Sequence, residues 1–222
     1  MLGASRGLTI KICGVRSVDD ARLALDAGAD AIGLNFVPGR ARAIELETAE
    51  AIVHAVGTQL SVVGVVADPS DDLLASLASL GLAAIQLHGA ESVERCMELT
   101  ARDPDGGTAV FFKAVSVRGP GDIEAAGLYP GPCVLFDAAA APGQPAGGTG
   151  HGFDWTWLDR AGSRPYWLAG GLRPDNVGEA VRRSAAVGID VASGVERAVG
   201  VKDAAKVVAF VQAARHAFTR RT

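Results

Sequence analysis

The chain has 222 residues, of which 49% are hydrophobic and 21% charged, and its formal net charge is −4. This length suits one large domain, and the mild, scattered charge predicts neither nucleic-acid nor membrane-surface binding. No run of about 18 apolar residues could span a bilayer, and the short, polar start does not have the form of a signal peptide. Three cysteines without a CxxC spacing predict neither a disulfide framework nor a zinc site. We therefore expect a reduced cytoplasmic protein without a metal.

Short β-rich runs alternate with segments of helical period along the whole chain. The expected strands are residues 8–13, 31–36, 61–67, 84–88, 109–115, 133–137, 166–169 and 188–192. The expected helices are residues 17–27, 47–56, 70–80, 91–101, 119–127, 154–161, 174–185 and 203–217. Boundary signals predict N-caps at Ser17 and Ser70, a first-turn proline at Pro174, and C′ glycines at Gly28, Gly57 and Gly81.

Eight such units without a break in composition predict a single-domain (β/α)8 barrel, a TIM barrel, over residues 1–222. An open doubly wound sheet is the alternative. It usually has fewer strands and often carries a G-x-G-x-x-G turn after the first one, which residues 13–16 do not have. The least regular segment, 138–152, is rich in Ala, Pro and Gly and follows the sixth strand, where a barrel often carries a mobile lid.

Alternation along the strands predicts which side chains face the barrel interior. Ile10 and Ile12 belong on the outer, helix-covered face, so Lys11 and Cys13 should point inward. The same alternation turns four further polar residues inward, namely Gln86, His88, Asp137 and Asp190. Buried polar groups are costly unless they are paired or used. Their convergence therefore favours a functional site at the carboxyl ends of the strands, where barrel active sites lie.

Cys13 and Asp137 end the first and sixth strands, and together they would make an acid–base pair that needs no cofactor. Taken singly, each has a simpler explanation. A cysteine at a strand end is often a small hydrophobe, an aspartate there is often a cap or ion-pair partner, and His88 alone could be a hydrogen-bonded core residue. Cys96 and Cys133 are interpreted as structural.

Glycine-rich turns follow the seventh and eighth strands. They contain Gly170 and Gly171 in one turn, and Ser193 and Gly194 in the other. Glycines let the backbone approach a ligand closely, and these two loops of a barrel commonly bind a phosphate. We therefore expect a phosphorylated ligand. No Walker-type lysine follows, so hydrolysis of a nucleoside triphosphate is not indicated.

Several motifs together resemble the phosphoribosylanthranilate isomerase family of tryptophan biosynthesis, a TIM-barrel family. They fall in order along the chain: KICG at 11–14, GADAIG at 28–33, QLHG at 86–89, KAV at 113–115, LFD at 135–137, GGTG at 147–150, FDW at 153–155, GGL at 170–172 and DVASGVE at 190–196. The resemblance covers nearly the whole chain, and the motifs are far more specific together than singly.

The resemblance implies the Amadori rearrangement of N-(5-phosphoribosyl)anthranilate to a 1-deoxyribulose 5-phosphate, without a cofactor. It makes Asp137 the general acid and Cys13 the general base, and it places Arg42 on the anthranilate carboxylate. The residues expected to contact substrate are Arg42, His88, Gly170, Gly171, Ser193 and Gly194, with Lys11, Gln86 and Asp190 supporting them. Lys11 either favours the thiolate of Cys13 or pairs with Asp190 inside the barrel.

Three positions depart from the family pattern, namely Arg40, Ala192 and His151. They bear on substrate range more than on reaction class, so a paralogue acting on a related phosphoribosyl amine is one alternative. Another sugar-phosphate isomerase is a second, although the imidazole-ribotide isomerase of histidine synthesis has an aspartate where this chain has Cys13. A catalytically inactive phosphate-binding barrel is the third. The expected partner is a small phosphorylated substrate, with the chain acting as a monomer or a homodimer.

Overall fold

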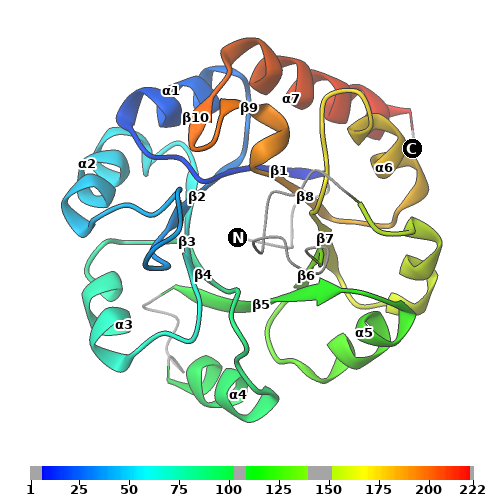
Figure 1. Cartoon of the computed structure of the whole chain (residues 1–222), viewed down its shortest axis with the longest axis horizontal. Helices are drawn as coiled ribbons and strands as arrows, with labels where there is room; N and C mark the ends of the chain where they lie inside the picture. Colours follow the sequence, from blue (N-terminus) through cyan, green and yellow to red (C-terminus); the bar gives the residue numbers. More distant parts are fainter. Residues whose placement is uncertain (1–6, 103–108, 140–151, 221–222) are drawn as a thin grey trace.

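A computed structural model describes residues 7–102, 109–139 and 152–220 of the chain, and Figure 1 shows its closed ring of parallel strands surrounded by helices. The barrel strands are β1 (Thr9–Cys13), β2 (Ala31–Asn35), β3 (Ser61–Val66), β4 (Ala84–Leu87), β5 (Val110–Val117), β6 (Val134–Ala138), β7 (Tyr166–Leu168) and β8 (Gly188–Val191). The α-helices are α1 (Val18–Asp26), α2 (Leu46–Val56), α3 (Asp71–Ala78), α4 (Val93–Ala101), α5 (Pro120–Ala125), α6 (Val177–Arg183) and α7 (Ala204–Thr219).

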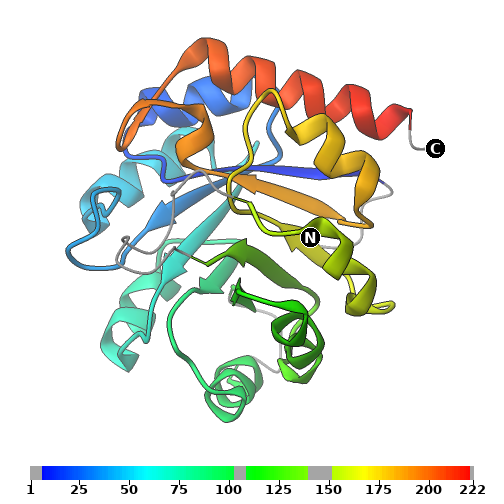
Figure 2. The same cartoon turned by 45° about the vertical axis from the view of Figure 1, so that its right-hand side comes forward.

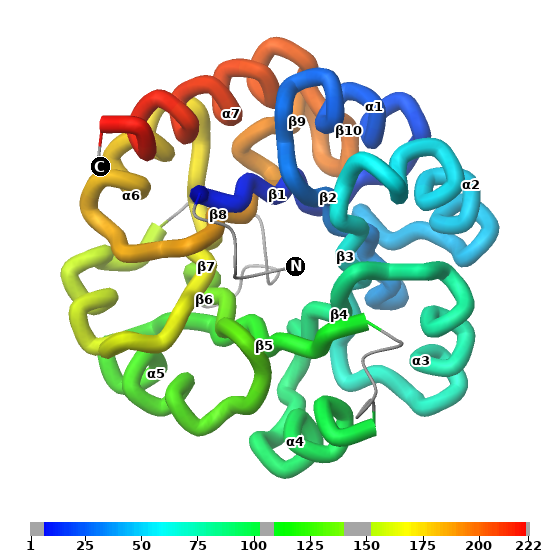
Figure 3. Tube along the Cα trace, turned by 180° about the vertical axis from the view of Figure 1, so that it is seen from behind, coloured from blue at the N-terminus to red at the C-terminus, as the bar shows by residue number. Residues whose placement is uncertain are grey.

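The barrel closes where β1 pairs in parallel with both β2 and β8. Lys11 lies opposite Ala31 on one side and Asp190 on the other. The view from behind in Figure 3 shows the same closed ring with α1 to α7 outside it. The (β/α)8 fold predicted from the sequence is therefore confirmed, and its closure places a cation of the first strand beside a carboxylate of the last.

Three of the six helix boundary signals are confirmed. The Ser17 side chain accepts a hydrogen bond from Asp20 N, the Ser70 side chain accepts one from Leu73 N, and Gly28 follows α1 with a φ of 85°.

Three boundary expectations are wrong. Gly57 is itself the C-cap of α2, in right-handed conformation. Gly81 lies two residues beyond the Ser79 cap of α3. Pro174 lies before α6, which begins only at Val177 because Asn176 first bonds the preceding loop through its side chain.

The segment expected as a helix at 154–161 is a 3-10 helix, η2 (Trp155–Ala161). A 3-10 helix has three residues per turn, so Trp155 and Leu158 lie on one face. Leu158 is buried, and Trp155 packs against the same core. The tighter turn therefore buries this face, and Gly162 ends it with a φ of 62°.

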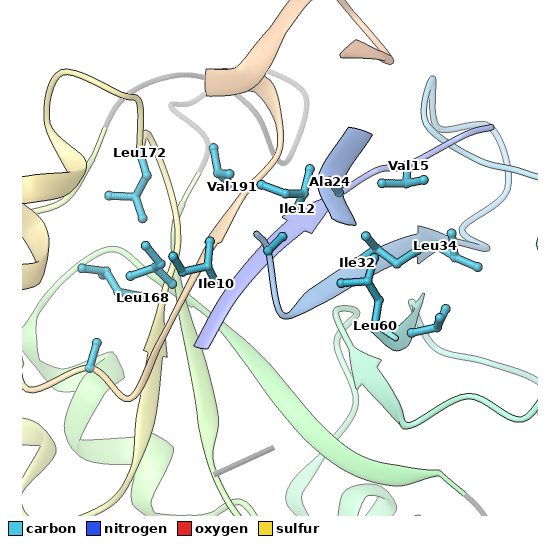
Figure 4. Close-up of a cluster of buried hydrophobic side chains, with 14 of the residues drawn as sticks. Ile10, Ile12, Val15, Ala24, Ile32, Leu34, Leu60, Leu168, Leu172 and Val191 are labelled. Atoms are coloured by element: carbon cyan, nitrogen blue, oxygen red, sulfur yellow. The ribbon is translucent and has the colours of Figure 1, made fainter. Parts of the chain in front are cut away.

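Two layers of apolar side chains make the core. The outer layer lies between strands and helices, and Figure 4 shows Ile10 and Ile12 of β1 there with Ile32, Val191 and Ala24. The inner layer fills the barrel, and we call it the apolar interior: Val63, Ala84, Phe112, Ala114, Cys133, Leu135, Trp167 and Ala169. The predicted alternation of outward and inward residues on β1 and β6 is thus observed, which turns the polar residues of these strands inward.

A short antiparallel hairpin, β9 (Glu196–Ala198) and β10 (Val201–Lys202), follows the 3-10 helix η3 (Ser193–Val195). Figure 2 shows it at one end of the barrel, next to α7. It returns Lys202 to the carboxyl end of β1, where Nζ donates to Cys13 O at 2.6 Å. Among the described residues, no helix is both long and apolar enough to cross a membrane.

Candidate active site

Cys13 is the last residue of β1 and is partly exposed at the rim of the barrel. A Cβ atom on Gly33 of the neighbouring β2 would lie 2.8 Å from its Sγ and 3.0 Å from Lys11 Nζ, so only glycine leaves room for both side chains. Removal of the thiol from water and the charge of Asp190 raise the pKa of Cys13, while Lys11 and Lys202 act to lower it. The resting thiol is therefore harder to ionise than a free cysteine.

Lys11 is fully buried inside the barrel. Its Nζ lies 2.9 Å from Asp190 Oδ1 and 3.1 Å from Gln86 Oε1. Burial acts to lower the pKa of Lys11, but the charges of Asp190 and Cys13 outweigh it and raise the pKa above its ordinary value. The two roles left open for Lys11 are combined here, because it pairs with Asp190 and also opposes the rise in the pKa of Cys13.

Gln86, His88 and Asp137 continue this network across the barrel. Gln86 Nε2 lies 3.0 Å from His88 Nδ1, and His88 Nε2 lies 3.2 Å from Asp137 Oδ2. Gln86 is fully buried, whereas the His88 and Asp137 side chains are 29% and 14% exposed, so the network opens to solvent at these two residues. We call the six residues the polar network: Lys11, Cys13, Gln86, His88, Asp137 and Asp190.

Arg42 lies in the loop between β2 and α2, and its side chain crosses Gly14, where a Cβ atom would lie 2.5 Å from Arg42 Cδ. Its Nε and Nη2 donate to the two carboxylate oxygens of Glu196 at 2.8 and 2.7 Å. These hydrogen bonds raise the pKa of Arg42. They also lower the pKa of Glu196, although burial of the carboxylate acts against them. The guanidinium is therefore held in a fixed plane at the rim.

Glu196 and Lys202 were not predicted from the sequence as site residues. Lys202 Nζ lies 3.0 Å from Glu196 Oε1 and also donates to the carbonyls of Cys13 and Ala192. Burial lowers the pKa of Lys202. The one available signal was Glu196, a lone carboxylate in an otherwise apolar and glycine-rich turn. Lys202 carried no local signal, since its partners are distant in sequence or lie across a hairpin.

The two glycine turns meet at the same end of the barrel. Gly170 and Gly171 have φ values of 82° and 66°. A Cβ atom on Gly170 would lie 2.3 Å from Ala138 N, and one on Gly194 would lie 1.9 Å from Leu172 O. Side chains would separate these segments, so the glycines allow the end of β6 and the backbone after β7 and β8 to pack closely. Ser193 begins η3 in the second turn.

The three positions that depart from the family pattern and the expected lid lie around this site or outside the described residues. Arg40 is exposed in the loop that carries Arg42, and Ala192 precedes η3. His151 and most of the loop expected as a lid, residues 140–151, lie outside the described residues. Within the described ranges, no three His, Cys, Asp or Glu side chains lie close enough together to hold a metal ion.

Comparison with known proteins gives one consistent result. Residues 10–213 match the family model of N-(5'-phosphoribosyl)anthranilate isomerase. The chain is 43% identical over 213 residues to the N-(5'-phosphoribosyl)anthranilate isomerase of Myxococcus xanthus, covering 93% of this chain and 95% of that one. A crystal structure of phosphoribosyl anthranilate isomerase from Thermus thermophilus superposes with a TM-score of 0.80 at 34% identity, covering 93% and 98% of the two chains.

A third similar protein is a phosphoribosyl anthranilate isomerase solved in complex with reduced 1-(o-carboxyphenylamino)-1-deoxyribulose 5-phosphate. Its TM-score is 0.78 at 30% identity, with 94% of this chain and 99% of that chain covered. A family match over most of the sequence, relatives above 40% identity and the shared barrel agree. The chain therefore belongs to the N-(5'-phosphoribosyl)anthranilate isomerase family, whose members are TIM-barrel isomerases.

Proposed function

We propose that the chain converts N-(5-phosphoribosyl)anthranilate into 1-(o-carboxyphenylamino)-1-deoxyribulose 5-phosphate, with Asp137 as general acid and Cys13 as general base. The observation that carries this assignment is the polar network, in which a thiol and a carboxylate at the ends of β1 and β6 share one barrel mouth. Membership of the isomerase family and the product-like ligand of the similar structure support the choice of substrate.

The reaction needs one proton delivered to the ring oxygen, one removed from C2 and one moved to C1. Asp137 donates a proton to the furanose ring oxygen as the C1–O bond breaks, and the nitrogen lone pair forms a protonated Schiff base at C1. Cys13, as thiolate, removes the C2 proton, and those electrons neutralise the iminium to give an enolamine. Tautomerisation moves the enol proton to C1 and leaves a ketone at C2. No oxidant or metal enters this balance.

The substrate has a carboxylate at one end and a phosphate at the other. Arg42 and the two glycine-rich turns are the parts of the site that suit these anions. We assign the anthranilate carboxylate to Arg42. Glu196 occupies Nε and Nη2 of this side chain, and Nη1 has no hydrogen-bond partner among the described residues, so Nη1 can donate to the substrate. We assign the phosphate to the turns that contain Gly171 and Gly194. His88 lies beside the acid, with its Nε2 3.2 Å from Asp137 Oδ2.

The test is turnover of freshly prepared phosphoribosylanthranilate, followed by loss of its fluorescence and corrected for spontaneous hydrolysis. We expect Cys13→Ala and Asp137→Asn each to lose about a hundredfold or more in rate, as removal of an acid or base does. Both should still bind the reduced product analogue. Cys96→Ala, which removes a thiol from α4, is the control and should keep the wild-type rate. Near-wild-type rates in both site variants would refute the assignment.

No turnover by the wild-type protein would point to a related phosphoribosyl amine or to a binding protein without catalysis, with Arg40 and Ala192 as the first positions to revert. We further propose that residues 1–222 form one domain, a monomer or homodimer. We place the enzyme in the cytoplasm, because it belongs to a biosynthetic family and its three cysteines are free.

A further inference from the structure

A row of polar side chains connects the cation in the barrel to the proposed acid. It runs from Lys11 on β1 through Gln86 on β4 and His88 just after it to Asp137 on β6, with gaps of 3.1, 3.0 and 3.2 Å between the facing atoms. The Lys11 end is anchored by Asp190 at 2.9 Å. The first two gaps are hydrogen bonds whose direction follows from the chemistry of the groups they join, and the third is a close polar contact between a ring nitrogen and a carboxylate oxygen.

The direction is set at the Lys11 end. An ammonium group has only donors, and the raised pKa keeps Lys11 charged, so the amide group that faces it must present its oxygen. Gln86 then presents its NH2 group to His88 Nδ1, which must accept with a lone pair. The ring hydrogen is consequently on Nε2, the nitrogen that lies 3.2 Å from Asp137 Oδ2.

We propose that Gln86 is a positioning residue that fixes His88 as the neutral tautomer with hydrogen on Nε2, so that His88 can only donate to Asp137. This rests on the proposed function in one respect, namely that Asp137 is the general acid. With Oδ2 held as an acceptor, the acid proton resides on Oδ1 and is available to the sugar ring oxygen. In the other tautomer, Nε2 would offer a lone pair, and Asp137 would give its hydrogen bond to His88 in place of the substrate.

The other charged groups around the end of β4 are engaged with backbone or with each other. Lys113 on β5 lies 3.2 Å from Glu91 and donates to the carbonyls of Leu87 and Gly89. Asp68, after β3, accepts from Ala90 N, and Glu91 accepts from Gly89 N. These contacts fix the backbone that carries His88, whose own N–H donates to Val66 O at 2.7 Å. Of the residues that the structure describes, Gln86 and Asp137 provide the polar contacts to the ring.

The first experiment reads the tautomer directly in the resting protein, with no substrate present. Long-range proton–nitrogen correlation spectra of nitrogen-15-labelled protein distinguish protonated from unprotonated imidazole nitrogens, and loss of one signal set in His88→Gln assigns the residue. We expect Nε2 protonated and Nδ1 unprotonated at neutral pH. In Gln86→Glu, both oxygens at position 86 are acceptors, so Nδ1 should become protonated. The exposed His54 is the internal control and should not change. Protonated Nδ1 in the wild type would overturn the proposal.

The second experiment compares the activity losses of two substitutions at Gln86. Which loss is larger distinguishes a positioning role from a packing role. Gln86→Glu keeps the shape and can pair with Lys11, so a structural role predicts a milder effect than that of Gln86→Leu. Our proposal predicts the reverse. Gln86→Glu imposes the wrong ring hydrogen and should lower kcat about a hundredfold, whereas Gln86→Leu leaves the tautomer free and should lower it about tenfold. KM should change little in both.

A smaller loss in Gln86→Glu than in Gln86→Leu, with both variants folded, would refute the positioning role. Failure of the proposed function is distinguishable, because the spectra do not depend on turnover. A protein inactive on phosphoribosylanthranilate would still show whether Gln86 sets the His88 tautomer.

Discussion

The inside of the barrel is divided between the apolar interior and the polar network. The two regions fill the space inside the closed sheet with different kinds of interaction. The apolar interior relies on shape: Trp167 is fully buried, and a Cβ atom on Gly188 would lie 2.5 Å from its ring. The polar network relies on pairing, as in the contact of Lys11 with Asp190. Packing fixes the first region through volume, whereas the second is fixed by the direction of hydrogen bonds.

The same residue type behaves differently in the two regions. Burial raises the pKa of Cys133 in the apolar interior to about 11, with only Arg164 acting against it. For Cys13 of the polar network, the charges of Lys11 and Lys202 oppose the rise in the pKa, and the thiol is partly exposed. A thiol in a barrel is thus suited to proton transfer only where cations and an opening to solvent accompany it.

The largest effect should come from breaking the apolar interior. Trp167→Ala removes the largest fully buried side chain of the described residues, and large-to-small changes of this kind cost about 3 to 5 kcal/mol of unfolding free energy. Its indole Nε1 makes no hydrogen bond, so the loss should come from volume alone. Urea denaturation measures it. Trp167→Phe, which keeps an aromatic ring, is the control and should recover most of the stability; an equal loss in both would contradict a packing origin.

Breaking the polar network should cost nearly as much, but the loss should be recoverable by a second change. Lys11→Met leaves Asp190 buried without its cation, and removing one partner of a buried pair costs about 3 to 5 kcal/mol. Lys11→Met with Asp190→Leu removes both charges and should regain most of that stability. The double variant should stay inactive. If it is no more stable than Lys11→Met, pairing is not what stabilises this region.

The sequence predicted the barrel because its strands are short apolar runs with a period of two, and the same period placed Lys11 and Cys13 inside. The 3-10 helix at Trp155–Ala161 was missed because the choice between helix types depends on which face the core covers. The pairing of Lys202 with the end of β1 was also missed. Lys202 and Cys13 are 189 positions apart in the sequence. They meet because of the β9–β10 hairpin, whose sequence has no periodic pattern that would predict it.

A third prediction concerns the rim, where Glu196 holds Arg42 beside the polar network. Glu196→Gln keeps the shape but removes the charge that aligns the guanidinium, and it leaves Lys202 without its counter-charge. We expect KM for phosphoribosylanthranilate to rise about tenfold, which corresponds to about 1.4 kcal/mol of binding, with a smaller change in kcat. Steady-state kinetics measure this split. Glu179→Gln, on the exposed face of α6, is the matched control, and an unchanged KM in Glu196→Gln would rule out alignment by Glu196.

The smallest effect should be a shift in the pH dependence of the Cys13 thiol. Because its pKa is raised, the thiolate is scarce at neutral pH and increases as the pH rises past the ordinary range for cysteine. The rate of Cys13 alkylation by iodoacetamide should therefore climb with pH, while Cys133, buried in the apolar interior, stays unreactive in the folded protein. Lys202 acts to lower the pKa of Cys13, so Lys202→Met should displace the alkylation profile further toward alkaline pH. A displacement toward acid would mean that Lys202 affects this thiol through structure and not through its charge.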